Sequence, residues 1–261
     1  MKLHHVMSGP QQGLPVLLVH GLFGQGRNLG AQARRLAETR PVVTVDLRNH
    51  GESPHDADAT YAALAGDLAG LIDDLGGRVD LVGHSMGGKA AMVLALTQPS
   101  LVRRLVVMDI APLAYGHDQT THIDAIESLD LTGITRRSEA DRALAMRVED
   151  RGVRAFLLQS LDLKSSPPVW RLNLAALRQQ MPQIVGWPGD LPRGSFTGKT
   201  MALRGSSSDY VGEAGEAALR EFFPQVRIVT LKGAGHWLHA DAPEAVAETL
   251  APFLGDGRDP A

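Results

Sequence analysis

Short apolar runs alternate along the chain with stretches whose apolar positions recur at helical spacing. Residues 16–19 and 42–47 are β-branched and aliphatic runs of the length and composition typical of buried strands. Between them, residues 28–38 predict a helix, and residues 61–75 predict a second helix with one apolar face. That face consists of Leu64, Leu68, Leu71 and Leu75. Strands that are apolar throughout and separated by helices indicate a mostly parallel sheet covered on both faces, so we expect an α/β, doubly wound fold.

The alternation stops between about Leu113 and Trp187, where helical patterns follow one another. We predict helices over residues 138–148, 153–161 and 169–181. This segment comes directly after an apolar strand predicted over residues 105–108, and an insertion at that end of a strand lies over the edge of the sheet where sites form. We therefore expect a core built from residues 1–112 and 188–261, with residues 113–187 as a helical cap.

Composition limits the classes of function. The 261 residues carry a net charge of −3, which suits one α/β domain with an insertion and does not favour a nucleic-acid partner. No cysteine is present, so the chain has neither a thiol nucleophile nor a disulfide. No run has the length of a membrane span, and the opening MKLHHVMSGPQQG lacks the apolar centre of a signal peptide. These features predict a cytoplasmic protein, and they leave its oligomeric state open.

The run VDLVGHSMGG over residues 79–88 has the pattern of a nucleophile elbow with Ser85 at its tip. A serine hydroxyl is a weak nucleophile, so it must be held exposed on a tight strand-to-helix turn within reach of a base. Gly83 and Gly87 leave room for strand and helix to pack closely, while Ser85 takes the strained backbone. The sequence therefore predicts a catalytic serine at this turn.

His236 is the candidate base. It follows the apolar run that begins at Val226, after a Gly-Ala-Gly loop that lets the chain turn sharply, and an imidazole there is suited to take a proton near neutral pH. His236, His239 and Asp241 also suggest metal ligands, but no HExxH-type helix or third nitrogen at usable spacing accompanies them. We expect His239 to be structural, and we expect no metal.

The segment HGLFG over residues 20–24 follows the first predicted strand. A glycine-flanked loop at a strand end can direct backbone N–H groups at the oxyanion of a tetrahedral intermediate. We assign this role to the amides of Leu22 and Met86, with Phe23 and the Leu22 side chain lining the acyl pocket. His20 is expected to form structural hydrogen bonds.

The acid has two candidates. In many proteins with such a serine and histidine, the acid stands two or three residues after the glycine that ends the next-to-last strand. In this chain that glycine is Gly205, Ser208 occupies the expected acid position, and Asp209 lies one residue further on. Asp109 ends the apolar strand within VVMDIAP, and a carboxylate there needs a partner such as an imidazolium. We prefer Asp109 and keep Asp209 as the rival.

These motifs together resemble the α/β-hydrolase family and, more narrowly, the YbfF-like carboxylesterases. The resemblance covers nearly the whole chain and lies in HGLFG (20–24), VDLRNHGESPH (45–55), GHSMGGKAAM (83–92), VVMDIAP (106–112), WRLNLAAL (170–177) and GAGHWLHAD (233–241). It implies hydrolysis of esters or acyl thioesters by a Ser-His-Asp triad without a cofactor, under a small helical cap. It also implies that the position of Asp109 supplies the acid and that Lys89 and Trp237 support the pocket.

The expected function is thus a carboxylesterase that forms an acyl-enzyme on Ser85, with a small-molecule ester or thioester as substrate. A carbon–carbon bond hydrolase or lyase of the same fold is the alternative. Haloalkane and epoxide hydrolysis are disfavoured, because those relatives carry a carboxylate where Ser85 stands. A non-catalytic binding module usually lacks a triad member, and none is missing here.

Overall fold

The computed structural model describes residues 1–116, 119–255 and 257. Within these ranges a seven-stranded sheet forms in the order β1-β3-β2-β4-β5-β8-β9, with β1 antiparallel to β3 and each of the other neighbouring pairs parallel. The strands are β1 (His5–Ser8), β2 (Val16–Val19), β3 (Val42–Val45), β4 (Val79–His84), β5 (Val102–Met108), β8 (Lys199–Gly205) and β9 (Arg227–Leu231). The predicted α/β fold is confirmed, and β1 is an edge strand that the sequence analysis did not identify.

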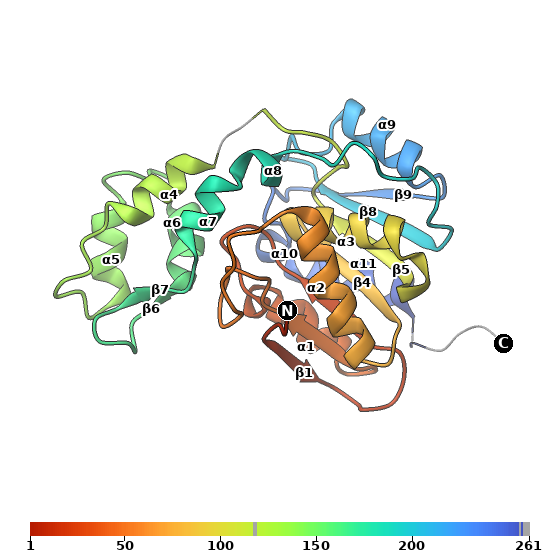
Figure 1. The fold of residues 1–261 in the computed structure, drawn as a ribbon, viewed down its shortest axis with the longest axis horizontal. Helices are drawn as coiled ribbons and strands as arrows, with labels where there is room; N and C mark the ends of the chain where they lie inside the picture. Colours follow the sequence, from red (N-terminus) through yellow and green to blue (C-terminus); the bar gives the residue numbers. More distant parts are fainter. Residues whose placement is uncertain (117–118, 256, 258–261) are drawn as a thin grey trace.

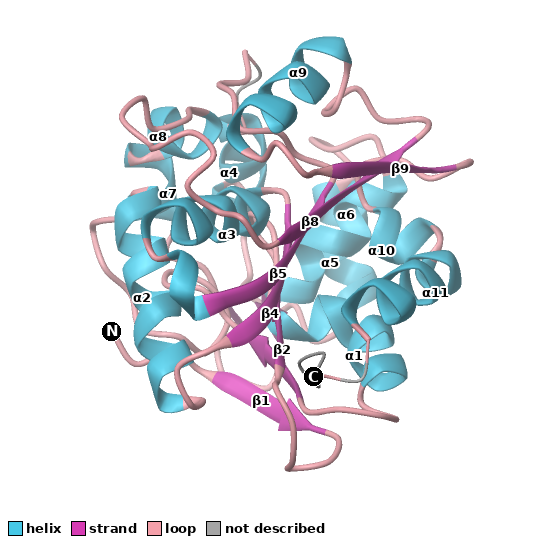
Figure 2. Cartoon of the chain, turned by 90° about the vertical axis from the view of Figure 1, so that its right-hand side faces the viewer, coloured by secondary structure: helices cyan, strands magenta, loops and turns pink. Residues whose placement is uncertain are grey.

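Successive side chains of the central strands enter two separate apolar layers. In β2, Leu17 and Val19 join the layer that contains helices α2 and α3, whereas Val16 and Leu18 join the layer that contains α1 and α11. Figure 2 shows the sheet edge-on between these two groups of helices. The helices are α1 (Gly30–Leu36), α2 (Tyr61–Asp74), α3 (Met86–Thr97), α9 (Glu213–Phe222), α10 (Leu238–Asp241) and α11 (Pro243–Leu254). Burial on both faces explains why the strands are apolar without alternation.

The chain between β5 and β8 forms a lobe of helices at one end of the sheet (Figure 1). It contains α4 (Thr120–Glu127), α5 (Arg137–Leu144), α6 (Arg151–Leu157), α7 (Leu174–Gln179) and α8 (Met181–Val185), and a two-stranded ribbon of β6 (Leu161–Asp162) and β7 (Val169–Trp170). We call this segment the cap.

The helix predicted over residues 169–181 is wrong in its first part. Val169 and Trp170 are extended and pair with β6, and α7 begins only after Asn173, whose side chain accepts a hydrogen bond from the Ala176 amide. Pro167 and Pro168 precede this segment and disfavour helical backbone before it, and asparagine favours a helix start. Periodicity alone did not reveal either effect.

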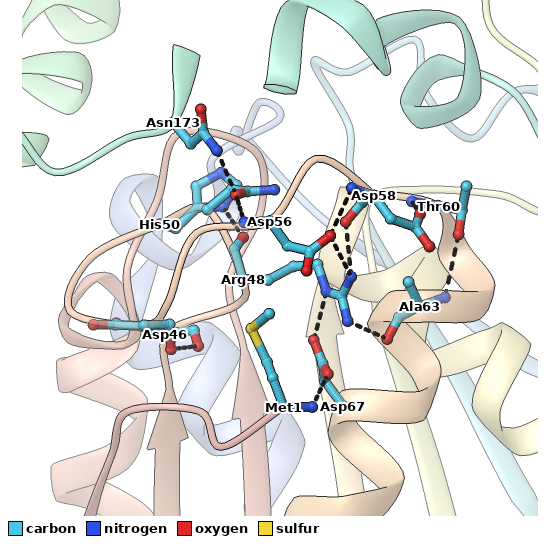
Figure 3. A network of polar contacts seen from close by, with 12 residues as sticks. Met1, Asp46, Arg48, His50, Asp56, Asp58, Thr60, Ala63, Asp67 and Asn173 are labelled. Carbon is cyan, nitrogen blue, oxygen red and sulfur yellow. Dashed lines mark hydrogen bonds and ion pairs between the residues drawn. The ribbon is translucent and has the colours of Figure 1, made fainter. Parts of the chain in front are cut away.

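The loop after β3 ties the cap to the core. The Gly51 amide donates to the Arg171 carbonyl (2.8 Å), and the Asn173 amide donates to the Asn49 carbonyl (3.0 Å). Arg48 of the same loop fixes it to α2, because its guanidinium donates to Asp67 at 2.6 Å (Figure 3). The cap is thus fixed to a loop that is itself anchored on α2.

Candidate active site

Ser85 lies between β4 and α3 with φ 51° and ψ −121°, a backbone conformation that non-glycine residues rarely adopt. The turn is tight because two glycines let backbones touch. A Cβ at Gly83 would lie 2.4 Å from the Gly87 carbonyl oxygen, and a Cβ at Gly87 would lie 2.3 Å from the His20 carbonyl oxygen. Neither contact is sterically possible, so the predicted elbow depends on both glycines.

Ser85, His236 and Asp109 form one chain of hydrogen bonds. The Nε2 of His236 lies 3.1 Å from the Ser85 Oγ, and its Nδ1 lies 2.8 Å from the Asp109 Oδ2. The three residues follow β4, β9 and β5 at the same end of the parallel sheet. A carboxylate only accepts hydrogen bonds, so Nδ1 carries the imidazole hydrogen and Nε2 is free to accept from the serine hydroxyl.

Asp109 is fully buried and accepts further hydrogen bonds from β8 and its following loop. The Gly205 amide donates to Oδ1 at 3.0 Å, and the Ser208 hydroxyl donates to Oδ2. Ser208, at the position where the sequence analysis expected an acid, therefore supports the carboxylate from the loop after the neighbouring strand. Asp209 is exposed, and the structure does not bring it to His236 among the contacts of the described residues.

Two side chains that the sequence analysis did not assign hold His236, one at its ring and one at its main-chain carbonyl. The Tyr210 ring stacks on it with 3.7 Å between centroids and 14° between planes. The His84 Nε2 donates to the His236 carbonyl at 2.8 Å. Burial, and then the neighbouring His239 and His236, lower the pKa of His84 well below its ordinary value, so His84 is a neutral support. No sequence signal marked Tyr210, whereas His84 lay within the elbow motif.

The loop after β2 is held by two neutral histidines. The Leu47 amide donates to the His20 Nε2 at 2.9 Å, and the Phe23 amide donates to the His50 Nε2 at 3.1 Å. Burial lowers the pKa of both imidazoles, that of His50 to about 3, so each Nε2 remains an acceptor. His20 has the structural role that was expected of it, and His50 was missed.

Leu22 and Met86, whose amides are the predicted oxyanion donors, both line the cavity that Ser85 lines. Leu22 follows the Gly21 turn, and Met86 is the first residue of α3, where a helix leaves its N–H groups without internal partners. Phe23 has φ 62°, and its N–H is occupied by His50, which leaves the Leu22 amide as the neighbouring donor in the loop.

A cavity of about 280 Å³ opens beside Ser85. Its wall is mostly apolar and comes from the core and from the cap, and Phe23 and Trp237 both line it. Their role in binding substrate stays a prediction. Other lining residues include Met86, Ile110, Val153, Phe156, Leu157 and Ile184. The arrangement places a serine hydroxyl hydrogen-bonded to an imidazole at the wall of a mostly apolar cavity.

A sequence model of the alpha/beta hydrolase family matches residues 16–249. The chain belongs to the alpha/beta hydrolase family. Its fold is that of a hydrolase of known structure described as a marine microorganism esterase, with a TM-score of 0.92, 31% identity, and coverage of 97% of this chain and 99% of that chain.

This alpha/beta hydrolase is also similar to two curated proteins over most of its length. The chain is 38% identical over 260 residues to the sn-1-specific diacylglycerol lipase ABHD11 of Mus musculus, covering 96% of this chain and 84% of that protein. It is 37% identical over 246 residues to the esterase YbfF of Escherichia coli (strain K12), covering 93% of each. The resemblance inferred from the motifs is confirmed.

Two arginines of the cap form ion pairs within the cap itself. Arg154 and Arg171 pair with Asp141 and Asp162 within the cap. Among the described residues, no cluster of three or more histidine, aspartate or glutamate side chains could hold a metal ion. No helix in the described ranges has the length and apolar character needed to cross a bilayer.

Proposed function

We propose that this chain hydrolyses carboxylic esters through an acyl-enzyme on Ser85. The observation that carries the proposal is the continuous hydrogen-bond chain from the Ser85 hydroxyl through His236 to buried Asp109, at the edge of an apolar cavity. Membership of the alpha/beta hydrolase family and similarity to an esterase and a lipase support it.

In the first half of the reaction, the Ser85 Oγ attacks the ester carbonyl carbon while the His236 Nε2 takes the hydroxyl proton. The carbonyl π electrons move onto oxygen, and the amides of Leu22 and Met86 stabilise that oxyanion. Asp109 stabilises the imidazolium that forms and keeps its ring oriented. When the tetrahedral intermediate collapses, the bond to the leaving oxygen breaks and His236 returns the proton to it, which leaves Ser85 acylated.

In the second half, water replaces the alcohol. His236 takes a proton from the attacking water, the same two amides stabilise the second oxyanion, and the bond to the Ser85 Oγ breaks as His236 reprotonates it. The products are a carboxylic acid and free enzyme. The same steps apply to an acyl thioester with a thiol as leaving group, so the proposal extends to thioesters.

We further propose that residues 113–187 act as the cap domain of the site. Val153, Phe156 and Leu157 of α6 and Ile184 of α8 line the cavity beside Ser85. Side chains at this position exclude water from the acyl group and strengthen the electrostatic interactions at the oxyanion.

The test is hydrolysis of p-nitrophenyl esters of graded chain length by the wild-type protein, Ser85→Ala and Ser128→Ala. Ser128 lies in the cap, and its hydroxyl donates to the Ala125 carbonyl, so it is a matched serine control away from the cavity. We expect wild type and Ser128→Ala to turn over ester alike and Ser85→Ala to lose on the order of a million-fold in turnover. Turnover of a diketone acid without turnover of any ester would instead favour the carbon–carbon bond hydrolase alternative.

A further inference from the structure

Lys89 is a charged side chain at the cavity for which the proposed mechanism has no use. In the described part of the wall, the cavity is lined by this one lysine and by no arginine, aspartate or glutamate. Its side chain is 1% exposed. A lysine in such an environment requires an explanation, because burying an ammonium group without a counter-charge costs stability.

The ammonium of Lys89 is held by neutral groups. The Nζ donates to the carbonyls of Val185 (2.9 Å) and Gly186 (2.5 Å) at the end of α8. It also lies 4.7 Å from the centroid of the Tyr115 ring and 5.7 Å from that of Tyr61. Among the described residues that line the cavity there is no carboxylate to pair with it, and burial lowers its pKa to about 7. In its protonated form the amine has three N–H donors, so the two carbonyls leave one donor and the positive charge for a ligand.

Lys89, Tyr61 and Ile184 are buried and lie together on the cavity wall, because the Lys89 Nζ is 5.7 Å from the Tyr61 ring and the Tyr61 hydroxyl donates to the Ile184 carbonyl. We call this side the closed end. Phe156 and Trp237, whose rings lie 5.5 Å apart, are partly exposed, and we call their side the mouth. Lys89 also follows Ser85 by one turn of α3, and its amide donates to the Ser85 carbonyl. One turn corresponds to an axial rise of about 6 Å. An acyl group bound to Ser85 that extends away from the mouth therefore runs towards this ammonium.

We propose that Lys89 determines specificity by binding a carboxylate at the far end of the acyl group, so that the preferred substrates are monoesters of dicarboxylic acids. The acyl side is favoured because the leaving alcohol must depart, and water must enter, through the mouth. The inference rests on the proposed ester hydrolysis at Ser85. A substrate carboxylate supplies the counter-charge that the described wall lacks.

The experiment compares mono-p-nitrophenyl adipate and pimelate with the uncharged p-nitrophenyl hexanoate and heptanoate, in wild type, Lys89→Met and Tyr61→Phe. Methionine keeps the unbranched shape of lysine without its charge. Tyr61→Phe is the matched control, because the Tyr61 hydroxyl donates to the Ile184 carbonyl (2.6 Å) and so ties the same end of α8 without a charge. An acetyl ester of 4-hydroxybenzoate places the carboxylate on the leaving group instead.

We expect wild type to prefer the diacid monoesters in kcat/KM by roughly tenfold or more, the size typical of a hydrogen bond to a charged group. Lys89→Met should abolish that preference mainly through KM, and Tyr61→Phe should keep it. Equal loss of both substrate types in Lys89→Met, or no preference in wild type, would show that Lys89 only ties the cap to the core. Preference for the 4-hydroxybenzoate ester alone would overturn the acyl-side assignment. Absence of activity on every ester by folded wild type would refute the proposed function itself.

Discussion

Replacing Asp109 with asparagine should lower the rate of ester hydrolysis, because the hydrogen bonds of Asp109 determine the tautomer of His236. The carboxylate accepts from the Gly205 amide on Oδ1 and from His236 and Ser208 on Oδ2. An asparagine side chain has one acceptor oxygen and one NH₂ group. If its oxygen stays with Gly205, the NH₂ group faces the His236 Nδ1 and imposes the tautomer with hydrogen on Nε2, which can no longer accept the Ser85 proton.

The opposite amide orientation satisfies His236 but sets the NH₂ group against the Gly205 N–H. That leaves a buried donor without an acceptor and costs about 1–3 kcal/mol. The first orientation is therefore favoured, and we expect kcat to fall on the order of ten-thousand-fold, as for loss of the correct tautomer in other triads. This fall corresponds to about 5.4 kcal/mol in the activation free energy.

The assay is steady-state hydrolysis of a p-nitrophenyl ester, with circular dichroism to confirm that each variant is folded. Asp209→Asn is the matched control, because Asp209 is exposed and one residue beyond Ser208. It should retain activity within a few-fold. Near-normal turnover of Asp109→Asn, or a greater loss in Asp209→Asn, would refute the assignment of the acid.

Two further predictions concern stability. Gly87→Ala should lower the free energy of unfolding by about 1–3 kcal/mol or more, because the new methyl group collides with the His20 carbonyl. Gly66→Ala, which has open space around it on helix α2, should raise the free energy of unfolding by about 0.5–1 kcal/mol. Equal urea midpoints for the two variants would contradict the packing at the elbow. Burial lowers the pKa of His50 to about 3 and that of His239 to about 4, whereas both have a pKa of 6.5 in the unfolded chain. The unfolded chain therefore binds more protons than the folded chain between these pH values. The stability that is present above pH 6.5 is lost as the pH falls towards the folded-state pKa values. The urea midpoint should therefore drop between pH 6.5 and 4, and His50→Gln should show a smaller drop than wild type; an unchanged drop in that variant would argue against a neutral His50.

Much of the fold could be predicted because its central strands are buried on both faces. Continuous apolar runs such as Val16–Val19 identify such strands without help from tertiary structure. Strand β1 was missed because it is short and mostly exposed at the sheet edge. The β6–β7 ribbon was missed because two-residue strands carry no periodicity and depend on their partner.

Some residues of the candidate site could likewise be predicted from the sequence, and others could not. Ser85, His236 and the preferred acid Asp109 follow strands that the hydrophobic pattern identified, and parallel strands bring their ends together. Their catalytic roles remain proposals. Tyr210 and His50 could not be assigned, because their contacts with the imidazole and with the loop after β2 come from loops whose paths the sequence pattern does not predict. The closed end of the cavity depends in turn on where α8 meets α3, which appears only in three dimensions.

The central claim is that Ser85 is an activated nucleophile. Its most direct test is labelling with a fluorophosphonate, followed by mass spectrometry of the peptides. We predict one phosphonyl adduct on the peptide that contains Ser85, and its loss in Ser85→Ala and His236→Ala. An unlabelled Ser85 in folded wild-type protein, or an adduct on another residue that persists in Ser85→Ala, would contradict the account.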